Sequence, residues 1–220
     1  MAKTAGAPLS ISRQTLQRLP LYLEFLRKYK EDGNVNVSSA VMASALALHP
    51  VQVRKDVASV STVDGNPRIG FGLDTLINDI EDFLGYNNVT EAVLVGAGNL
   101  GIALLSYKTF ETCGIQIIAA FDSDKSKIGL SVHGKEILDS AKITDMCRRF
   151  NVHIGIIITV PAEQAQMVCD CMTAGGVLAI WNFAPVKLAV PENVIVHNEN
   201  LTASLSALSS MLRQRKSHNK

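Results

Sequence analysis

Three glycines, Gly96, Gly98 and Gly101, give the strongest indication of chemistry in this sequence, because they are spaced as G-x-G-x-x-G. The apolar segment Ala92–Val95 precedes them and predicts a strand. In such a loop the first glycine permits a tight turn, and the second lets backbone N–H groups approach a pyrophosphate. The third lets the following helix pack closely on the strand. The pattern predicts a dinucleotide site, although a strand-to-helix turn without a ligand would use the same residues.

A carboxylate stands where a dinucleotide site needs one. The segment Gln116–Phe121 predicts a second strand and is followed by Asp122, 21 residues after Gly101. A carboxylate at this place accepts hydrogen bonds from ribose hydroxyls and would repel a 2′-phosphate. No arginine follows closely to hold such a phosphate, so NADH and NAD are the predicted cofactors. The alternative is a solvated turn residue at the end of a strand.

The second half of the chain alternates apolar segments with helical patterns, which predicts a parallel, doubly wound α/β sheet. Ligands of such sheets bind beyond the carboxyl ends of the strands. Besides the glycine loop and Asp122, two proline-containing segments fall there, and each could equally be a simple proline turn. The predicted cofactor residues are Gly96, Ala97, Gly98, Asn99, Leu100, Gly101, Asp122, Thr159, Pro161, Asn182, Phe183, Ala184 and Pro185.

The first 72 residues carry nine Lys and Arg against five Asp and Glu, and their pattern predicts short helices. Ser38 and Ser39 are expected to cap a helix that turns Val41 and Ala45 inward, and a second helix follows Pro50. Two short helices joined by a tight turn indicate a helix-turn-helix. The segment Asp64–Gly72 indicates the hairpin of a winged helix.

The predicted DNA contacts use residue types that suit bases and phosphates. They are Ser38, Ser39, Gln52, Arg54, Lys55 and Arg68, with Asp56 expected to face a neighbouring side chain instead. The charge excess is modest, so a small helical cap with solvated basic residues is the alternative.

The helix expected over Leu73–Leu84 ends near Gly85, which places a domain boundary there: residues 1–85 and residues 86–220. The sequence contains no run of about 18 uncharged apolar residues, so no membrane span is predicted. The first residues also lack the apolar core of a signal peptide. A cytoplasmic protein without membrane contact is therefore expected. Pro20 predicts a kink or a restart of the first helix.

Four cysteines, Cys113, Cys147, Cys169 and Cys171, match no zinc spacing, so buried reduced thiols and no metal are expected. The last leucines, Leu201, Leu205, Leu208 and Leu212, repeat at helical spacing. Their apolar stripe could dock on a second subunit or cover the edge of the sheet.

From Ile11 to Leu212 the chain resembles the Rex family of redox-sensing transcriptional repressors. The resemblance rests on the motifs Val53–Asp56, the glycine loop, Phe121–Asp124, Ile157–Pro161 and Asn182–Val186. It implies an N-terminal winged helix, a Rossmann-type sheet and a homodimer that exchanges its C-terminal helices. It also implies binding to a palindromic double-stranded operator that NADH releases, whereas NAD competes without releasing it. Tyr107 matches a tyrosine that contacts the cofactor site in the family.

The chain departs from the family pattern at several places. Val57–Ser61 and the wing differ from the usual residues, and Leu201 replaces a common aromatic. Glu24 and Asn200 stand where some relatives form an ion pair between the domains. On the motifs and the resemblance together, the chain is expected to be a repressor without catalytic residues. The alternatives are an NAD-dependent oxidoreductase and a degenerate paralogue that binds NAD(H) without strong DNA binding.

Overall fold

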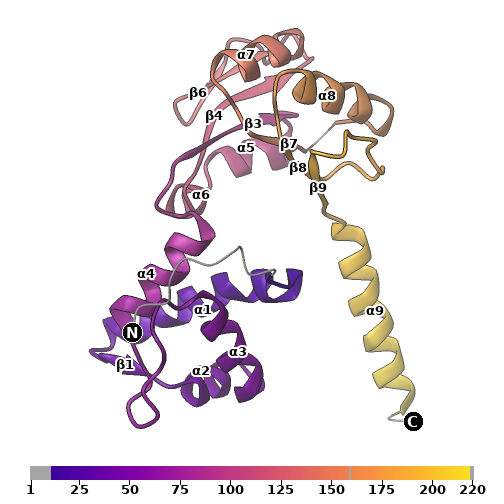
Figure 1. The fold of residues 1–220 in the computed structure, drawn as a ribbon. Helices are drawn as coiled ribbons and strands as arrows, with labels where there is room; N and C mark the ends of the chain where they lie inside the picture. The colour runs from indigo at the N-terminus through magenta and orange to yellow at the C-terminus, as the bar shows by residue number, and fades with distance from the viewer. Residues whose placement is uncertain (1–10, 159, 219–220) are drawn as a thin grey trace. The chain divides into compact units, whose positions relative to one another are not determined.

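The computed structural model describes residues 11–158 and 160–218, and the chain divides into two compact units between Asn88 and Val89 (Figure 1). Each unit has its own buried apolar core. The first unit is mostly helical, and the second is built around a seven-stranded sheet.

The first unit is a winged helix. Its elements are α1 (Arg13–Glu31), β1 (Asn36–Val37), α2 (Ser39–Ala45), α3 (Pro50–Val60), β2 (Phe71–Gly72) and α4 (Leu73–Leu84). Strand β1 pairs antiparallel with β2, where Val37 lies opposite Phe71. The loop between α3 and β2, residues 61–70, is the wing. The predicted helix-turn-helix is therefore α2 and α3, with the wing directly after α3.

Helix α1 runs through Pro20 without interruption, so of the two expected outcomes, a kink or a restart, the restart does not occur. Ser12 caps its first turn by accepting a hydrogen bond from the Thr15 backbone N–H (3.1 Å). Proline removes the bond to the carbonyl of Leu16. Because Leu16 and Pro20 lie on the exposed face, water can satisfy that carbonyl and the helix continues.

Helix α2 is turned about its axis relative to the sequence expectation. Val41 and Ala45 are exposed, whereas Met42 and Ala43 are buried. The helix has only seven residues, so the apolar pattern is too short to fix which face is buried. The expectation for Val41 and Ala45 is wrong.

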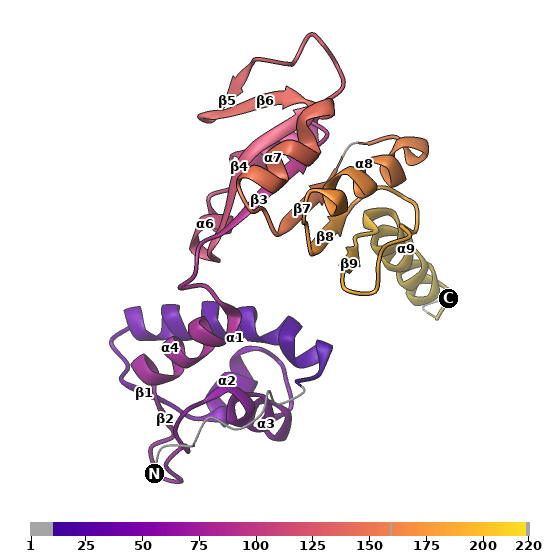
Figure 2. The same cartoon turned by 45° about the horizontal axis from the view of Figure 1, so that its top comes forward.

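The second unit confirms the predicted Rossmann-type sheet. Its strands are β3 (Thr90–Val95), β4 (Ile115–Asp122), β5 (Ser131–Val132), β6 (Lys135–Asp139), β7 (Ile154–Ile157), β8 (Ala179–Asn182) and β9 (Ile195–Asn198). They lie in the order β5-β6-β4-β3-β7-β8-β9, and only the β5–β6 pairing is antiparallel (Figure 2). The order reverses between β3 and β7, which is the switch point where such sheets bind ligands.

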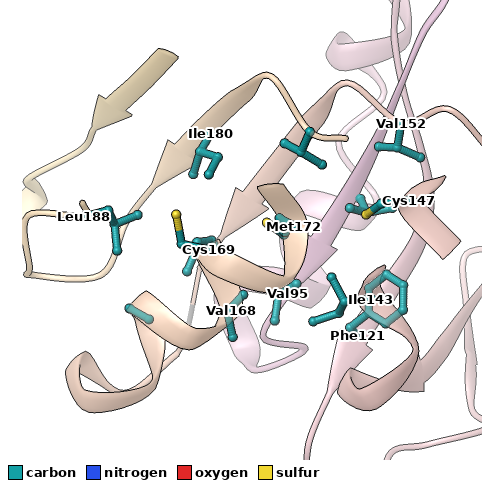
Figure 3. Close-up of a cluster of buried hydrophobic side chains, with 14 of the residues drawn as sticks. Val95, Phe121, Ile143, Cys147, Val152, Val168, Cys169, Met172, Ile180 and Leu188 are labelled. Atoms are coloured by element: carbon teal, nitrogen blue, oxygen red, sulfur yellow. The ribbon is translucent and has the colours of Figure 1, made fainter. Parts of the chain in front are cut away.

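Helices cover both faces of this sheet. Helices α7 (Ile143–Arg149) and α8 (Ala162–Ala174) cover one face, and α5 (Asn99–Leu105) with α6 (Thr109–Thr112) contributes to the other. Figure 3 shows the core between the sheet and helices α7 and α8, where Met172 of α8 and Ile143 of α7 pack over strand residues such as Val95. The alternation of Leu94 and Val95 between the two cores is the period of two expected of a strand.

The cysteines divide into two pairs by burial. Cys147 and Cys169 are buried, and their burial raises the pKa of each thiol to about 11. Cys113 and Cys171 are only half-buried, so the expectation of four buried thiols is wrong for these two. All four are free thiols.

The described residues contain neither a helix that is long and apolar enough to cross a membrane nor a cluster of three or more potential metal ligands. The last helix, α9 (Leu201–His218), exposes its apolar side chains: Leu205 is 68% exposed and Leu208 is 63% exposed.

Candidate functional site

The glycine loop between β3 and α5 has the backbone geometry that a dinucleotide site needs. Gly96 has a φ of +101°, in the left-handed region that favours glycine. A Cβ added to Gly101 would collide with the carbonyl oxygen of Gly96, so only glycine lets α5 approach β3 this closely. The first backbone N–H groups of α5, which follow Gly98, have no partner within the helix and can bind an anion.

Asp122, at the end of β4, ties the loop to the neighbouring strand. Its Oδ2 accepts hydrogen bonds from the Ala97 backbone N–H (2.9 Å) and from Lys127 Nζ (3.0 Å), and its Oδ1 accepts one from the Asp124 backbone N–H (2.9 Å). Burial alone would raise the pKa of this carboxyl. The three hydrogen bonds outweigh burial and hold the pKa below its ordinary value.

Asp122 therefore remains an anion and keeps room for a sugar hydroxyl. A carboxylate offers about four acceptor sites, and three of them are occupied here. Lys127 also lies 3.8 Å from Asp124, so two carboxylates face one ammonium group. The excess negative charge favours a ribose diol over a 2′-phosphate at this place.

A cavity of about 560 Å³ opens beside Asp122 and the glycine loop at the carboxyl ends of the strands. Its size suits part of a dinucleotide. Its lining residues come from the last residues of β3 and β4 and from the segments after β3, β4, β6 and β7: Val95, Gly96, Gly98, Asp122, Ser123, Lys127, Ser140, Ala141, Ile143, Val160, Pro161, Gln164, Met167, Val168 and Cys171.

The structure brings together only part of the predicted cofactor set. Gly96, Gly98, Asp122 and Pro161 line the cavity. The other loop residues, Ala97, Asn99, Leu100 and Gly101, form the turn and the start of α5. The segment Asn182–Pro185 and Tyr107 do not line this cavity, and Thr159 falls outside the described residues.

Asn182 is fully buried and braces its own loop. Its side-chain oxygen accepts from the Ala184 backbone N–H (3.0 Å), and its Nδ2 donates to the Val186 carbonyl (3.0 Å) and to Asn198 Oδ1 (2.9 Å). In this arrangement the amide shapes the turn after β8, and its Nδ2 donates only within the chain, with a further, longer bond to the Ala184 carbonyl (3.2 Å). Its proposed role is to position the backbone of this turn.

Tyr107 belongs to a row of aromatic rings. Its centroid lies 5.2 Å from that of Phe110, Phe110 lies 6.0 Å from Trp181, and Trp181 lies 4.6 Å from Phe183. Tyr107 itself is 54% exposed. This row joins α6 to the end of β8, which connects two segments that the sequence predicted separately.

Several cavity residues were missed by sequence reasoning. Lys127 lies five residues after Asp122, and its position in the turn after β4 was a usable signal. The apolar wall made by Ile143, Met167 and Cys171 comes from α7 and α8, and no local pattern marks it.

In the first unit, a groove of about 490 Å³ lies between α3 and the wing. Four predicted DNA contacts line it: Ser38, Ser39, Arg54 and Arg68. Ser38 also caps α2, because its Oγ accepts a hydrogen bond from the Val41 backbone N–H (3.2 Å). Asp64 lies in the same groove and was not predicted.

Asp56 faces neighbouring side chains, as expected, and the structure shows that most of them belong to helix α1. Its buried carboxylate accepts hydrogen bonds from Arg18 Nε (2.7 Å), Tyr22 Oη (2.8 Å), Thr15 Oγ1 (3.1 Å) and Gln52 Nε2 (2.9 Å). Burial alone would raise the pKa of Asp56, but these donors outweigh it and lower the pKa. The same burial and the bond to Asp56 raise the pKa of Tyr22 to about 12.

Gln52 is therefore not a freely rotating side chain. Asp56 occupies one of its amide protons, which leaves the second proton and Oε1 available. Adenine presents one acceptor and one donor in the major groove, so the remaining proton and the Oε1 atom of Gln52 could pair with both. Gln52 and Lys55 do not line the groove, although both are exposed.

These features define a class of protein: a winged-helix unit with a basic groove, joined to a Rossmann-type unit with a dinucleotide cavity. Two family models match the chain accordingly. The model described as a putative DNA-binding protein N-terminus matches residues 10–57, and the model described as a CoA binding domain matches residues 87–186.

The chain belongs to the Rex family of redox-sensing transcriptional repressors. It is 38% identical over 202 residues to the Rex repressors of Bacteroides fragilis and Treponema denticola, covering 92% of this chain and 91% and 95% of theirs. It is also similar to the crystal structure of the protein RSP in complex with β-NAD⁺ and operator DNA. The TM-score is 0.89 at 29% identity, and 96% of each chain is covered.

The packing of Gly101 on Gly96 generates a direct test of the nucleotide site. Gly101→Ala places a methyl group on the Gly96 carbonyl, so the loop must move and NADH affinity should fall at least about tenfold, or 1.4 kcal/mol. NADH fluorescence titration measures this. Gly72→Ala is the matched control, because its added Cβ meets only Thr75 Oγ1 at 3.9 Å. Unchanged NADH affinity in Gly101→Ala would show that the glycine loop does not bind the cofactor.

Proposed function

We propose that this chain is a DNA-binding transcriptional repressor that senses the NADH/NAD ratio and releases a palindromic operator when NADH binds. One observation carries the proposal. The chain matches, along 96% of its length, a structure that contains both β-NAD⁺ and operator DNA. A structure of RSP with β-NADH matches with a TM-score of 0.83.

The two units divide the work in this proposal. Residues 1–85 form the DNA-binding domain, in which Arg54 and Lys55 of α3 and Arg68 of the wing contact bases and phosphates. Residues 86–220 form the NAD(H)-binding domain. There the first turn of α5 holds the pyrophosphate, and Asp122 with Lys127 holds the adenosine ribose.

Release of DNA requires a difference in affinity. NADH must bind the released arrangement more tightly than the DNA-bound arrangement, because only differential affinity shifts a population. A tenfold preference at each of two sites would move the equilibrium by about 2.8 kcal/mol. NAD occupies the same cavity in this account, but it binds both arrangements with similar affinity.

The relatives argue against the oxidoreductase alternative, since they are named as transcriptional repressors. His197 does have a carboxylate partner, with its Nε2 3.0 Å from Glu199 Oε1. This pair does not line the cavity beside Asp122, and Glu199 Oε1 also accepts a hydrogen bond from Trp181 Nε1 (3.2 Å).

The proposed function predicts that labelled operator DNA is released by NADH and not by an equal concentration of NAD. Fluorescence anisotropy at fixed salt measures this.

Arg54→Ala should weaken operator binding by about 1–3 kcal/mol, because one base contact is lost. Lys108→Ala removes the same charge from the second unit and is the control. If the two variants lower operator affinity equally, Arg54 does not contact a base.

We further propose that two copies of the chain exchange their α9 helices. The observation that supports this is the exposure of Leu201, Leu205, Leu208 and Leu212, which all fall on one side of the helix at 53–68% exposure. Contiguous apolar patches of this kind usually mark a protein interface. A homodimer also matches the two-fold symmetry of a palindromic operator.

The dimer proposal predicts that a charge on this stripe dissociates the subunits. Leu205→Glu with Leu208→Glu should convert a dimer of the 23.7 kDa chain to monomers, since two carboxylates would be buried in the interface. Light scattering after size-exclusion chromatography measures the mass. Ser210→Glu, on the opposite side of α9, should leave the mass unchanged. A wild-type monomer would contradict the proposal.

A further inference from the structure

The two arms of the wing are held in different ways. The returning arm pairs with β1 through Phe71 and Val37, and the Leu73 backbone N–H donates to the Val35 carbonyl (2.9 Å). The outgoing arm, residues 61–65, has no strand partner in the described part of the chain. It therefore needs another support if the wing is to hold one position.

Asp79 of α4 supplies that support. Its Oδ2 accepts hydrogen bonds from Ser61 Oγ (3.0 Å) and from the Thr62 backbone N–H (2.7 Å), and its Oδ1 accepts one from Thr62 Oγ1 (2.8 Å). Asp79 is only 9% exposed, and Ser61 is 5% exposed. One buried carboxylate thus fastens the start of the outgoing arm to α4 at three points.

The tip of the wing is internally rigid, so its direction depends on its arms. Asn66 and Gly70 exchange two backbone hydrogen bonds of 2.8 Å each, and the Arg68 backbone N–H donates to Asn66 Oδ1 (2.9 Å). A Cβ on Gly65 would lie 2.7 Å from the ring of Phe71, so that ring packs directly on the outgoing arm. Arg68, within this turn, is exposed.

We propose that Asp79 is a positioning residue for DNA binding: by holding Ser61 and Thr62, it sets where the wing presents Arg68 to the operator. The inference rests on the proposed function, and it adds a residue that touches no DNA. Charge and geometry predict opposite effects for this residue. A carboxylate opposes binding to phosphates, so removing it would strengthen binding if charge alone acted.

The sign of the effect is the first test. Asp79→Ala should weaken operator binding about 3- to 10-fold and lower the slope of log affinity against log salt by about 1, as expected when one phosphate contact is lost. Asp82→Ala is the matched control, because it removes an exposed carboxylate from the same helix. It should bind the operator as tightly as the wild type or more tightly.

A double-mutant cycle is the second test. If Asp79 acts through Arg68, Arg68→Ala should add little to the loss in Asp79→Ala, whereas Arg54→Ala should add its full effect. Asp79→Asn should restore binding to within about twofold, since an amide oxygen can accept from Ser61 and Thr62 while its Nδ2 donates to Thr62 Oγ1. Additive losses with Arg68→Ala, or binding like Asp82→Ala, would overturn the proposal.

Amide hydrogen exchange of the free protein tests, without DNA, whether Asp79 holds the wing in place. Asp79→Ala should raise exchange at residues 62–70 while exchange in α1 and α4 stays protected, and Thr62→Val should do so more weakly without a change of charge. Unchanged exchange at the wing in both variants would overturn the proposal. Failure of the wild type to bind any operator would instead contradict the proposed function, and the exchange result would still decide the role of Asp79.

Discussion

The close approach of α5 to β3 at Gly101 is the constraint on which the nucleotide site depends. Any side chain at Gly101 would meet the Gly96 carbonyl, and Gly96 itself needs a left-handed backbone. With the turn fixed in this way, the Ala97 N–H reaches Asp122 across to β4. The loop, the carboxylate and the start of α5 are thus held together by backbone packing before any ligand binds, which lowers the entropic cost of binding.

Buried carboxylates have the corresponding role in the first unit. Asp56 joins α3 to α1 through Arg18, Tyr22 and Thr15, and Asp79 joins the wing to α4. Removing one partner from a buried pair costs about 3–5 kcal/mol, but an apolar replacement of the whole pair is often neutral. Such groups are therefore better explained by the geometry they impose than by stability. Here that geometry is the relative position of α3 and the wing, which together line the groove that contains Arg54 and Arg68.

Local patterns were sufficient to predict much of this fold. The glycine spacing predicted the turn after β3, and Leu73–Leu84 is a helix with the predicted limits. Strand β6 was missed because Lys135–Asp139 carries charges at both ends, which hides the apolar pattern of a strand. Its parallel pairing with β4 is a tertiary effect. The cavity wall from α7 and α8 was missed for the same reason, because it depends on residues that only the fold brings together. The bond between Gln52 and Asp56 joins residues four apart on α3, and this local spacing was a usable signal that was not used.

The central claim is that cofactor and operator binding are coupled through one chain, and linkage requires the coupling to be reciprocal. The most direct measurement is NADH affinity, determined by calorimetry, for the free protein and for the protein saturated with operator. The account predicts that operator DNA weakens NADH binding by the same factor by which NADH weakens operator binding, and that NAD affinity changes far less. Equal NADH affinity in the two states would contradict the account, because NADH could then release no DNA.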